Sequence, residues 1–449
     1  MIPLKVSDLA NALGCPMPSR DIEVQHVFTD SRKVVPGALF AALAGENFDG
    51  HDFVADAVKL GAAALLVERR QEIDVPQLVV DDVLLALGTV ASLVRDQLDP
   101  KVVGITGSNG KTTVKEMVAS ILALEGDVLA TQGNFNNELG LPLTLFELEQ
   151  KDKFAVLEMG ASKAGDIAYL AGIAKPGVGL VNNIAPAHLE GFGSIEGVAR
   201  AKGEMFAALP SNGCAVMNAD EPWLDLWRDM NTADTTLTFG AANGSDVLLE
   251  ESAEGASLKT PAGKLELKLA LPGRHNLINA AAATAIALAM DISMETIRQG
   301  LEQVKPVPGR LNLLHTTAGW TVIDDTYNAN PASLYAALRV LTQDYDQPWL
   351  VLGDMKELGE NSHKMHAEMG EAARNLGVRR LFGLGELSLA TVEAFGEGGE
   401  HFEDGGALQE RLRSLLEPGV ACLVKGSRSM AMEDIVAAIT DAPEMREAG

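Results

Sequence analysis

The sequence predicts an α/β protein of three domains. Its 449 residues exceed what one ordinary hydrophobic core organises, so two to four domains are expected. From about residue 84 onward, short apolar runs alternate with amphipathic helical patterns, which is typical of parallel sheets flanked by helices. We therefore divide the chain into residues 1–83, 84–312 and 313–449.

Each of the three regions has its own pattern. Residues 1–83 hold short elements separated by turns, and we expect a small N-terminal α/β domain there. In residues 84–312 a glycine-rich turn opens a series of strand–helix units, which predicts a central P-loop-type, mostly parallel sheet with flanking helices. Residues 313–449 repeat the alternation after a Pro-rich stretch, Val304 to Arg310, and we expect a C-terminal Rossmann-like domain.

The composition is typical of a soluble enzyme from a reducing compartment. Hydrophobic residues make up 47% of the chain, and no apolar run is long enough to span a bilayer. The first residues lack the cationic start and continuous apolar core of a signal peptide. Three widely separated cysteines, Cys15, Cys214 and Cys422, argue against a disulfide framework or a zinc site. We therefore expect a cytoplasmic enzyme, and nothing in the sequence requires more than a monomer.

The formal net charge of −26 limits the partners of the protein. Nonspecific binding of nucleic acid depends on Lys and Arg side chains that neutralise phosphates, so a strongly acidic protein repels polyanions. We expect small-molecule substrates, no nucleic acid and no integral membrane contact. An anionic substrate is compatible with this charge where local Lys, Arg, amide or metal groups meet its phosphates.

The most informative stretch is GITGSNGKTT, Gly104 to Thr113, which lies between an apolar run and an amphipathic helical pattern. Strand, glycine-rich turn, Lys-Thr and helix is the order that wraps backbone N–H groups around a phosphate chain, and the helix N-terminus adds partial positive charge. The usual phosphate loop has glycine five residues before Gly110, where this chain has Ile105, so the loop is a shortened version. A purely structural turn is the alternative, but Lys111 and Thr112 at the helix start favour ATP binding.

Polar residues follow several of the predicted strands, at the end of a parallel sheet where ligands gather. Glu158 ends an apolar strand and is either a magnesium ligand that faces the phosphates or a surface strand end. His188 follows the next such strand; a lone loop histidine is more often structural or exposed than a ligand, but here it points toward the same crevice. Lys202 lies on a predicted helix, where a lysine is usually solvated.

Three further stretches combine a turn or a helix start with candidate ligands. Asn276 begins an alanine-rich helix and is either an N-cap or a side-chain amide that reads the adenine edge. The stretch from Ile323 to Pro331 puts two aspartates at a strand end before a Tyr-Asn-Ala-Asn-Pro turn. Another strand ends in a group suited to clamp a carboxylate or a phosphate, Lys425, Ser427 and Arg428.

Together and in this order, these stretches resemble the Mur ligase family of ATP-dependent amide-forming enzymes. The family's central-domain signatures, shortened phosphate loop included, are matched by GITGSNGKTT, Glu158, His188, Lys202, GRHNLINAAAA and Arg310. Similarity to the member that adds D-alanyl-D-alanine lies in TQGNFNNELGLPLTL, DDTYNANPASL, VLGDMKELGENS and VKGSRSM. The family's uridine-nucleotide-binding domain is resembled by DSRKVVPGALFAALAGENFDGHDF, and the resemblance covers essentially the whole chain.

The resemblance implies an ADP-forming ligase of the acid–D-amino-acid class. The terminal carboxylate of UDP-N-acetylmuramoyl-tripeptide would attack ATP and form an acyl phosphate, and the amine of D-alanyl-D-alanine would then attack the activated carbonyl. The product would be the UDP-linked pentapeptide precursor of peptidoglycan. Such a reaction requires no nucleophilic side chain, so catalysis would consist of positioning and electrostatics.

The resemblance also implies roles for individual residues. The catalytic set is Lys111, Glu158, His188 and Lys202. Contacts with ATP are expected from Gly107, Ser108, Asn109, Gly110, Lys111, Thr112, Thr113, Asn276, Asn279, Arg310 and Asp325. Two Mg²⁺ ions are expected on Thr112, Glu158, His188 and Lys202, the last carbamylated by carbon dioxide. The other substrates are expected on Ser31, Arg32, Asp49, Gly50, His51, Asn134, Asn136, Asn137, Tyr327, Asn328, Asn330, Lys425, Ser427 and Arg428.

Three alternative functions compete with this ligase activity. A tripeptide-forming ligase or a folylpolyglutamate-synthase-like enzyme would use a different amine, but the NFNN and GDMKELG stretches argue against it, as does the lack of an Asp-Asn-Pro-Arg signature. A nucleotide-gated binding protein without ligase activity would not need the metal set of Glu158, His188 and Lys202. A phosphotransferase that acts on a hydroxyl is the third alternative.

Overall fold

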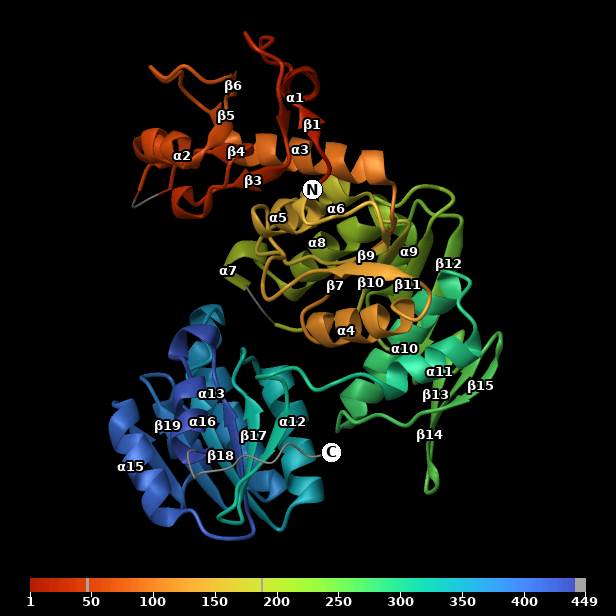
Figure 1. Cartoon of the computed structure of the whole chain (residues 1–449). Coiled ribbons are helices and arrows are strands. Elements are labelled where there is room, and N and C mark those ends of the chain that lie inside the picture. The colour runs from red at the N-terminus through yellow and green to blue at the C-terminus, as the bar shows by residue number, and fades with distance from the viewer. Residues whose placement is uncertain (46–47, 187–188, 441–449) are drawn as a thin grey trace.

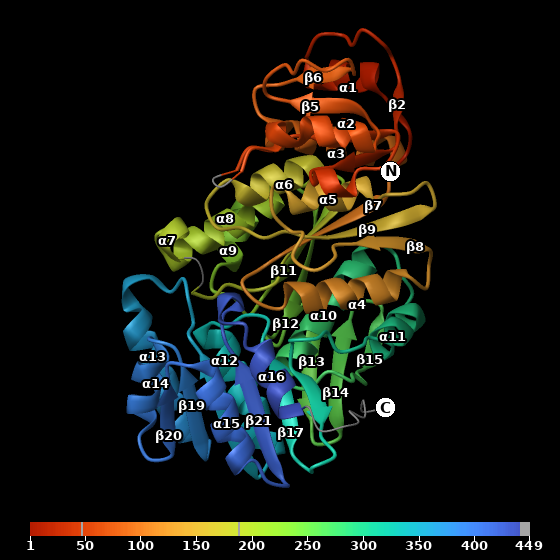
Figure 2. The same cartoon turned by 60° about the vertical axis from the view of Figure 1, so that its left-hand side comes forward.

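Three α/β units follow one another along the chain, with the N-terminal unit at the top of Figure 1, the central unit in the middle and the C-terminal unit below. A second view, turned by 60°, shows the same order (Figure 2). The structure is a computed structural model and describes residues 1–45, 48–186 and 189–440. Separate sheets of four, nine and six strands lie in the three units, which confirms the predicted three-part α/β fold.

The first unit contains a small, fully parallel sheet in the order β3-β4-β5-β6. Its strands are β3 (His26–Phe28), β4 (Ala38–Ala41), β5 (Ala62–Val67) and β6 (Gln77–Val79). A separate antiparallel pair joins β1 (Leu4–Lys5) to β2 (Glu23–Val24). The helices are α1 (Val6–Leu13) and α2 (Val54–Leu60), with 3-10 turns η1 (Ser31–Lys33) and η2 (Gly50–Phe53).

The second unit is built on a nine-stranded sheet in the order β15-β14-β13-β12-β11-β10-β7-β9-β8. Its parallel part comprises β7 (Lys101–Thr106), β8 (Asp127–Ala130), β9 (Asp152–Glu158), β10 (Val178–Val181), β11 (Cys214–Asn218), β12 (Thr235–Gly240) and β13 (Val247–Ser252). Two antiparallel strands extend it, β14 (Gly255–Thr260) and β15 (Gly263–Glu266).

Helices cover both faces of this sheet because successive strand residues point to opposite sides. On β7, Val102 faces one hydrophobic cluster and Val103 faces the other. The first cluster includes residues of α5 (Gly140–Phe146), α6 (Asp166–Ala174), α8 (Ile195–Ala207) and α9 (Leu224–Met230). The second includes residues of α4 (Lys111–Leu122), α10 (Arg274–Ala289) and α11 (Met294–Glu302). A short helix, α7 (Leu189–Phe192), precedes α8.

The third unit has a six-stranded sheet in the order β16-β17-β21-β18-β19-β20. Only the edge pair β16 (Asn312–His315) and β17 (Thr321–Asp325) is antiparallel; the others are β18 (Gln347–Gly353), β19 (Arg380–Leu384), β20 (Gly399–Phe402) and β21 (Val420–Lys425). The helices are α12 (Pro331–Asp344), α13 (Ser362–Leu376), α14 (Ser388–Phe395), α15 (Gly405–Leu415) and α16 (Glu433–Thr440), with 3-10 turns η3 (Gly359–Asn361) and η4 (Arg428–Met430). The sheet separates two hydrophobic clusters, one on each face.

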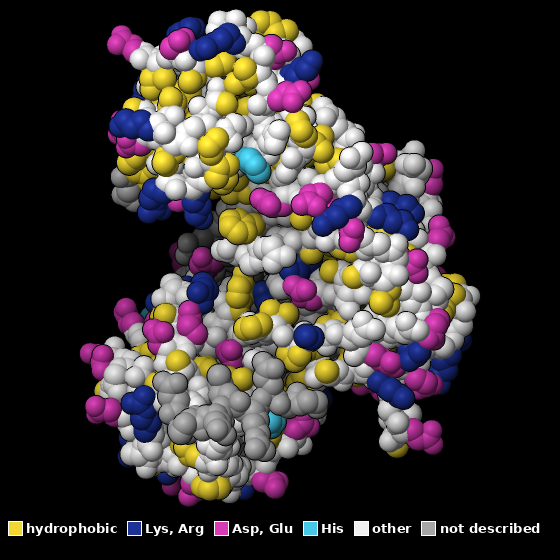
Figure 3. Space-filling view, in the orientation of Figure 1, with side chains coloured by type: hydrophobic (Ala, Val, Ile, Leu, Met, Phe, Trp, Pro, Cys, Tyr) yellow, Lys and Arg dark blue, Asp and Glu magenta, His cyan; other side chains and the backbone are white. Residues whose placement is uncertain are grey.

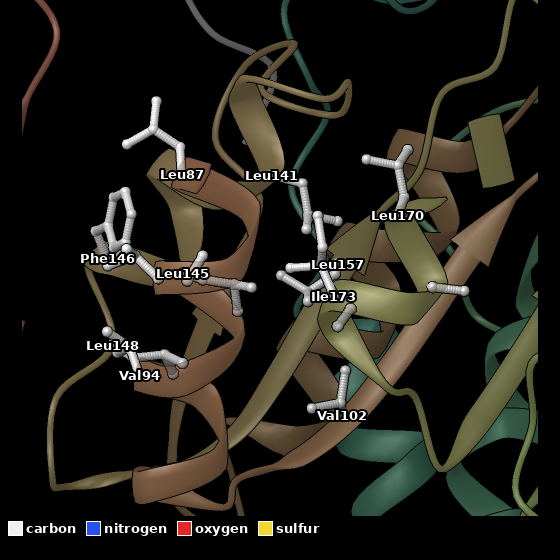
Figure 4. Packing of buried hydrophobic residues seen from close by; sticks show 14 of the residues in the cluster. Leu87, Val94, Val102, Leu141, Leu145, Phe146, Leu148, Leu157, Leu170 and Ile173 are labelled. Carbon is white, nitrogen blue, oxygen red and sulfur yellow. The ribbon is translucent and has the colours of Figure 1, made fainter. Parts of the chain in front are cut away.

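Helix α3 (Val83–Leu98) links the first and second units through a shared core. Figure 4 shows Leu87 and Val94 of this helix beside Leu145 and Phe146 of α5, and all four belong to one hydrophobic cluster. That cluster also contains core residues of α1 and of the first sheet. Because α3 contributes to both units, the hydrophobic core does not mark a limit between residues 83 and 84. The predicted domain limits, 83/84 and 312/313, therefore stay predictions.

Removal of one side chain from this shared core should destabilise the protein measurably. Leu145 is fully buried, so a Leu145→Ala variant is expected to lose about 2–5 kcal/mol of unfolding free energy through lost transfer energy and the residual cavity. Urea unfolding followed by circular dichroism measures this loss. The control is Leu124→Ala, since Leu124 is 42% exposed and its loss should stay within about 0.5 kcal/mol. Equal losses in the two variants would contradict the role of the shared core.

No helix within the described ranges is long and apolar enough to cross a membrane.

Candidate active site

The phosphate loop has the predicted strand–turn–helix form and connects β7 to α4. Gly110 has a φ of 76°, a left-handed conformation that favours glycine. A Cβ at Gly110 would also lie 2.6 Å from Asn279 Oδ1 and 2.7 Å from Asn182 Nδ2. Both backbone conformation and close packing therefore require glycine immediately before Lys111.

Side-chain amides from the end of β10 hold the loop in place. Asn183 Oδ1 accepts from the backbone N–H of Asn109 at 2.8 Å, and the Asn109 carbonyl accepts from Asn182 and Asn183 at 3.0 Å each. Ser108 Oγ accepts from the Ala185 N–H at 2.9 Å. The sequence analysis missed Asn182 and Asn183; their position directly after an apolar strand was the only signal that could have found them.

Asn276 and Asn279 continue this network from α10, and both are buried. Asn182 Nδ2 donates to Asn279 Oδ1 at 2.9 Å, and Asn279 Nδ2 donates to Asn276 Oδ1 at 3.1 Å. Asn276 Nδ2 donates to the carbonyl of Pro272 at 2.7 Å. A chain of amides therefore joins the start of α10 to the phosphate loop.

Glu158 stands beside the start of α4 and is only 2% exposed. Its Oε2 accepts from Thr112 Oγ1 at 2.7 Å, and its Oε1 accepts from Asn136 Nδ2 at 2.8 Å. Arg310 Nη2 donates to the same threonine oxygen at 2.7 Å. A buried carboxylate and a hydroxyl thus lie together at the place where a phosphate-bound cation would sit; carboxylate, hydroxyl and phosphate oxygens are the hard ligands that Mg²⁺ prefers.

Two lysines approach the same region from α4 and α8. Lys111 Nζ donates to the carbonyl of Gly107 at 2.9 Å, and burial lowers the pKa of Lys111, opposed by the charge of Glu158. Burial, with a further contribution from the charge of Lys111, lowers the pKa of Lys202 to about 7. Lys202 Nζ lies 5.9 Å from the centre of the Phe192 ring. Lys202 is therefore a buried amine, not the solvated lysine that its helix alone would favour.

The third unit contributes a second charged group. Lys425 Nζ donates to Asp325 Oδ2 at 2.6 Å and to the carbonyl of Asn328 at 2.9 Å. Burial raises the pKa of Asp325, while the neighbouring Lys425 acts in the opposite direction. The guanidinium of Arg310 lies 4.0 Å from the centre of the Tyr327 ring, a cation–π contact that fixes the linker before β16.

A cavity of about 790 Å³ brings most of the predicted residues together. It lies between the phosphate loop and the third unit, and it is lined by Gly107, Ser108, Asn109, Gly110, Lys111, Thr113, Asn134, Asn136, Asn137, Glu158, Lys202, Asn276, Asn279, Arg310, Asp325, Tyr327, Asn328, Asn330 and Lys425. Thr112 does not line the cavity, but it forms hydrogen bonds with Glu158 and Arg310, which do. In Figure 3 the surface is hollowed between the N-terminal and C-terminal units, and basic, acidic and hydrophobic side chains all lie along the rim.

Other predicted residues lie outside the cavity lining. Asp49 Oδ1 accepts from His51 Nδ1 at 2.7 Å, and His51 Nε2 accepts from the N–H of Glu68 at 3.0 Å, so both ring nitrogens of His51 are engaged within the N-terminal unit. Arg32 pairs with Asp30 at 2.9 Å in the turn that contains Ser31, and Gly50 begins η2. At the end of β21, Ser427 Oγ accepts from the N–H of Lys356 and Arg428 pairs with Glu433.

His188 lies outside the described residues. Across 1–45, 48–186 and 189–440, no group of three or more His, Cys, Asp or Glu side chains lies close enough to hold a metal ion. The pair of Thr112 and Glu158 would therefore need phosphate oxygens and water to complete a magnesium site. The binding and catalytic roles of all these residues stay predictions.

His275, which the sequence analysis did not single out, also lines the cavity. Burial and, to a smaller extent, the charge of Lys425 lower the pKa of His275 from 6.5 to about 4. Between these two values the native state binds fewer protons than the unfolded chain, so His275 is expected to lower stability as the pH falls from 6.5 to 4. Urea midpoints of the wild type should therefore drop more between pH 7 and about pH 4.5 than those of a His275→Gln variant. Parallel pH dependences would contradict this expectation.

Comparisons with known proteins agree with the geometry. The model of the Mur ligase middle domain matches residues 105–287, and the model of the Mur ligase glutamate ligase domain matches residues 309–428. The model of the Mur ligase family catalytic domain matches residues 23–123. The chain therefore belongs to the Mur ligase family, whose members couple amide formation to ATP.

Individual relatives show which members of the Mur ligase family this chain is similar to. The UDP-N-acetylmuramoyl-tripeptide–D-alanyl-D-alanine ligase of Escherichia coli K12 is 44% identical to this chain, and the match covers 98% of this chain and 99% of that protein. A crystal structure of MurF from Acinetobacter baumannii superposes with a TM-score of 0.91 at 35% identity over 98% of this chain and all of that one. MurF from Thermotoga maritima, solved in complex with ADP, has a TM-score of 0.85 at 30% identity over 92% of this chain and 97% of that one.

Proposed function

We propose that this chain is an ATP-dependent ligase that joins D-alanyl-D-alanine to UDP-N-acetylmuramoyl-tripeptide and releases ADP and phosphate. The product is the UDP-linked pentapeptide precursor of peptidoglycan. The observation that carries the proposal is the cavity in which the phosphate loop, the buried Glu158 and the Asp325–Lys425 pair face one another. Full-length similarity to ligases of this name supports the choice of substrates.

The reaction divides into two steps that these residues suit. The terminal carboxylate of the tripeptide attacks the γ-phosphorus of ATP, the bond to the β-phosphate oxygen breaks, and ADP leaves with that electron pair. The amine of the dipeptide then attacks the acyl phosphate carbonyl, loses a proton and expels phosphate. Lys111 and the backbone N–H groups at the start of α4 neutralise the charge that develops on the transferred phosphoryl group. No side chain forms a covalent bond, so the chain contributes position and charge.

Magnesium is the metal that the donors near the phosphate loop fit. Thr112 Oγ1 and Glu158 Oε2 lie 2.7 Å apart and both are oxygen ligands. We assign one Mg²⁺ to these two residues and a second to His188 and Lys202, with ATP phosphates as further ligands. Bound magnesium would neutralise phosphate charge and so make the γ-phosphorus more electrophilic.

Carbamylation of Lys202 is the modification that its surroundings favour. Only the neutral amine reacts with carbon dioxide: its nitrogen bonds to the carbon, and one proton leaves to solvent. A pKa of about 7 gives Lys202 a substantial neutral fraction near pH 7. The resulting carbamate is an anion beside the cationic Lys111, which removes the repulsion between two buried ammonium groups and supplies oxygen ligands for magnesium.

The substrates are assigned to three parts of the molecule. We place the uridine nucleotide on the N-terminal unit, near Ser31, Arg32 and Asp49 to His51, and the tripeptide near Asn134, Asn136 and Asn137. The dipeptide is assigned to Lys425, Ser427 and Arg428 at the end of β21, near the Tyr327 to Asn330 turn. We also propose a cytoplasmic location, since the three cysteines are unpaired, as in a reducing compartment.

Phosphate release by the purified protein tests this function. The full mixture contains ATP, Mg²⁺, UDP-N-acetylmuramoyl-tripeptide and D-alanyl-D-alanine, and each component is omitted in turn. Release that requires all four, with a UDP-linked pentapeptide identified by mass spectrometry, would establish the ligase. Turnover with a diamino acid in place of the dipeptide would indicate a tripeptide-forming ligase, and ATP binding without turnover on any amine would contradict the proposal.

A further inference from the structure

Asn109, in the phosphate loop, is held by groups from two units of the molecule. Its backbone N–H and carbonyl are bound by Asn182 and Asn183 at the end of β10, within the same unit. Its side-chain Oδ1 accepts a hydrogen bond of 2.7 Å from Asn330 Nδ2 of the third unit. The middle of the phosphate loop is therefore in direct contact with the C-terminal unit, from a residue 221 positions further along the chain.

Asn330 is fixed in the orientation that this contact needs. It is the N-cap of α12, where its Oδ1 accepts from the Ser333 N–H at 2.9 Å, and its own N–H donates to Ser333 Oγ at 3.1 Å. Because the oxygen end of the amide caps the helix, the nitrogen end must point away from it, toward Asn109. Any displacement of α12 therefore moves the Asn330 Nδ2 donor relative to the phosphate loop.

A second contact joins the loop to the linker that leads into the third unit. Arg310 donates to Thr112 Oγ1 at 2.7 Å and stacks on Tyr327 at 4.0 Å. Arg310 and Asn330 thus reach opposite ends of the Asn109 to Thr112 segment, which under the proposed function would bind the ATP phosphates. Two points of attachment resist rotation of the C-terminal unit better than one does.

We propose that Asn330 is a positioning residue that seats the C-terminal unit on the phosphate loop through Asn109. Under the proposed function, on which the catalytic consequence rests, this contact brings the dipeptide-binding end of β21 to the γ-phosphate. Each end of the Asn330 amide contacts a protein group, and the predicted contact of Asn330 with substrate stays a prediction beside this role. The seating itself does not depend on which substrates the enzyme uses.

An Asn330→Ser variant separates the two functions of this side chain. Ser caps a helix as well as Asn does, so α12 keeps its N-terminus. Ser, however, has no amide donor that reaches Asn109, and its shorter side chain offers no carboxylate to which a rotated Asn109 amide could donate, so the contact is lost. Asn109→Ala removes the same contact from the other side, and Ser333→Ala is the matched control because it weakens the cap but leaves the Asn330–Asn109 pair in place.

Distances between spin labels in the ligand-free protein report the seating directly. Labels at Gln150→Cys in the central unit and Glu393→Cys in α14 occupy exposed positions. A Cys15→Ser background removes the one partly exposed native thiol, since Cys214 and Cys422 are buried. We expect Asn330→Ser to shift the ratio of close to separated distances about fivefold toward separation, the equivalent of about 1 kcal/mol for one hydrogen bond. Asn109→Ala should give a similar shift, the double variant no further shift, and Ser333→Ala none.

Two results would overturn the proposal. One is an unchanged distance distribution in Asn330→Ser; the other is a shift by Asn330→Ser that persists at full size in the Asn109→Ala background. In turnover, seating predicts a lower kcat, whereas a side chain that only binds one substrate would raise the KM for that substrate with unchanged distances. Because the distances are measured without substrates, failure of the ligase assay would leave this test intact.

Discussion

A Lys111→Ala variant is expected to lose at least about 10³-fold in phosphate release, the largest effect of any single substitution in this chain. Lys111 is half-buried at the start of α4, and its Nζ donates to the carbonyl of Gly107 within the phosphate loop. Under the proposed function, its charge would stabilise the transferring phosphoryl group more strongly in this site than in water, because fewer water dipoles compete. Single-turnover measurements with saturating ATP separate this loss from a loss of nucleotide affinity.

The control for Lys111→Ala lies at the other end of the same strand. Lys101 begins β7 and is exposed, so Lys101→Ala should retain wild-type phosphate release. Both variants should unfold at similar temperatures. Burial already disfavours the Lys111 charge, and Glu158 keeps its hydrogen bonds to Thr112 and Asn136 when that charge is removed. Activity of Lys111→Ala within tenfold of the wild type would exclude the phosphate-binding role.

A Lys202→Ala variant is expected to lose about 10²–10³-fold in activity and to recover part of it with short carboxylic acids. If the wild-type lysine is carbamylated, the variant lacks an anionic oxygen ligand, and a small carboxylate that enters the space left by the side chain can replace it. Phosphate release measured against formate, acetate and propionate concentration detects the recovery. Removal of carbon dioxide and bicarbonate should lower wild-type activity as well.

The acids must act at position 202 and not elsewhere for this result to count. Lys111→Ala is therefore measured with the same acids and should gain nothing, because its lost group is a cation. An undiminished Lys202→Ala variant, or one that no acid restores, would argue against carbamylation. Lys202 would then be an unmodified buried amine beside Lys111, with its pKa lowered to about 7 by burial.

Local patterns were sufficient for the strand–loop–helix at Gly104 to Thr113 and for the three-part α/β fold. The glycine-rich sequence before Lys111 predicted a tight turn into a helix, and the structure has that turn, with a left-handed φ of 76° at Gly110. The strands that end in Glu158 and Asp325 were also recognisable, because each is a short run of consecutive apolar residues, a pattern that predicts a buried strand. Lys202 shows the limit, since its helix is amphipathic by pattern but its side chain is buried by packing.

What the sequence determined by itself is therefore local: the elements, their order, and which polar residues stand at the carboxyl ends of strands. The tertiary structure decided further contacts that neither these patterns nor the family resemblance had indicated. Asn182 and Asn183 form hydrogen bonds with the phosphate loop, and Asn330 donates a hydrogen bond to Asn109. His51 bonds to residues of its own unit, and α3 packs in a core that two units share. The physical reason is that hydrophobic periodicity depends on near neighbours, whereas an amide or imidazole has many equivalent partners, and only the assembled sheets select one.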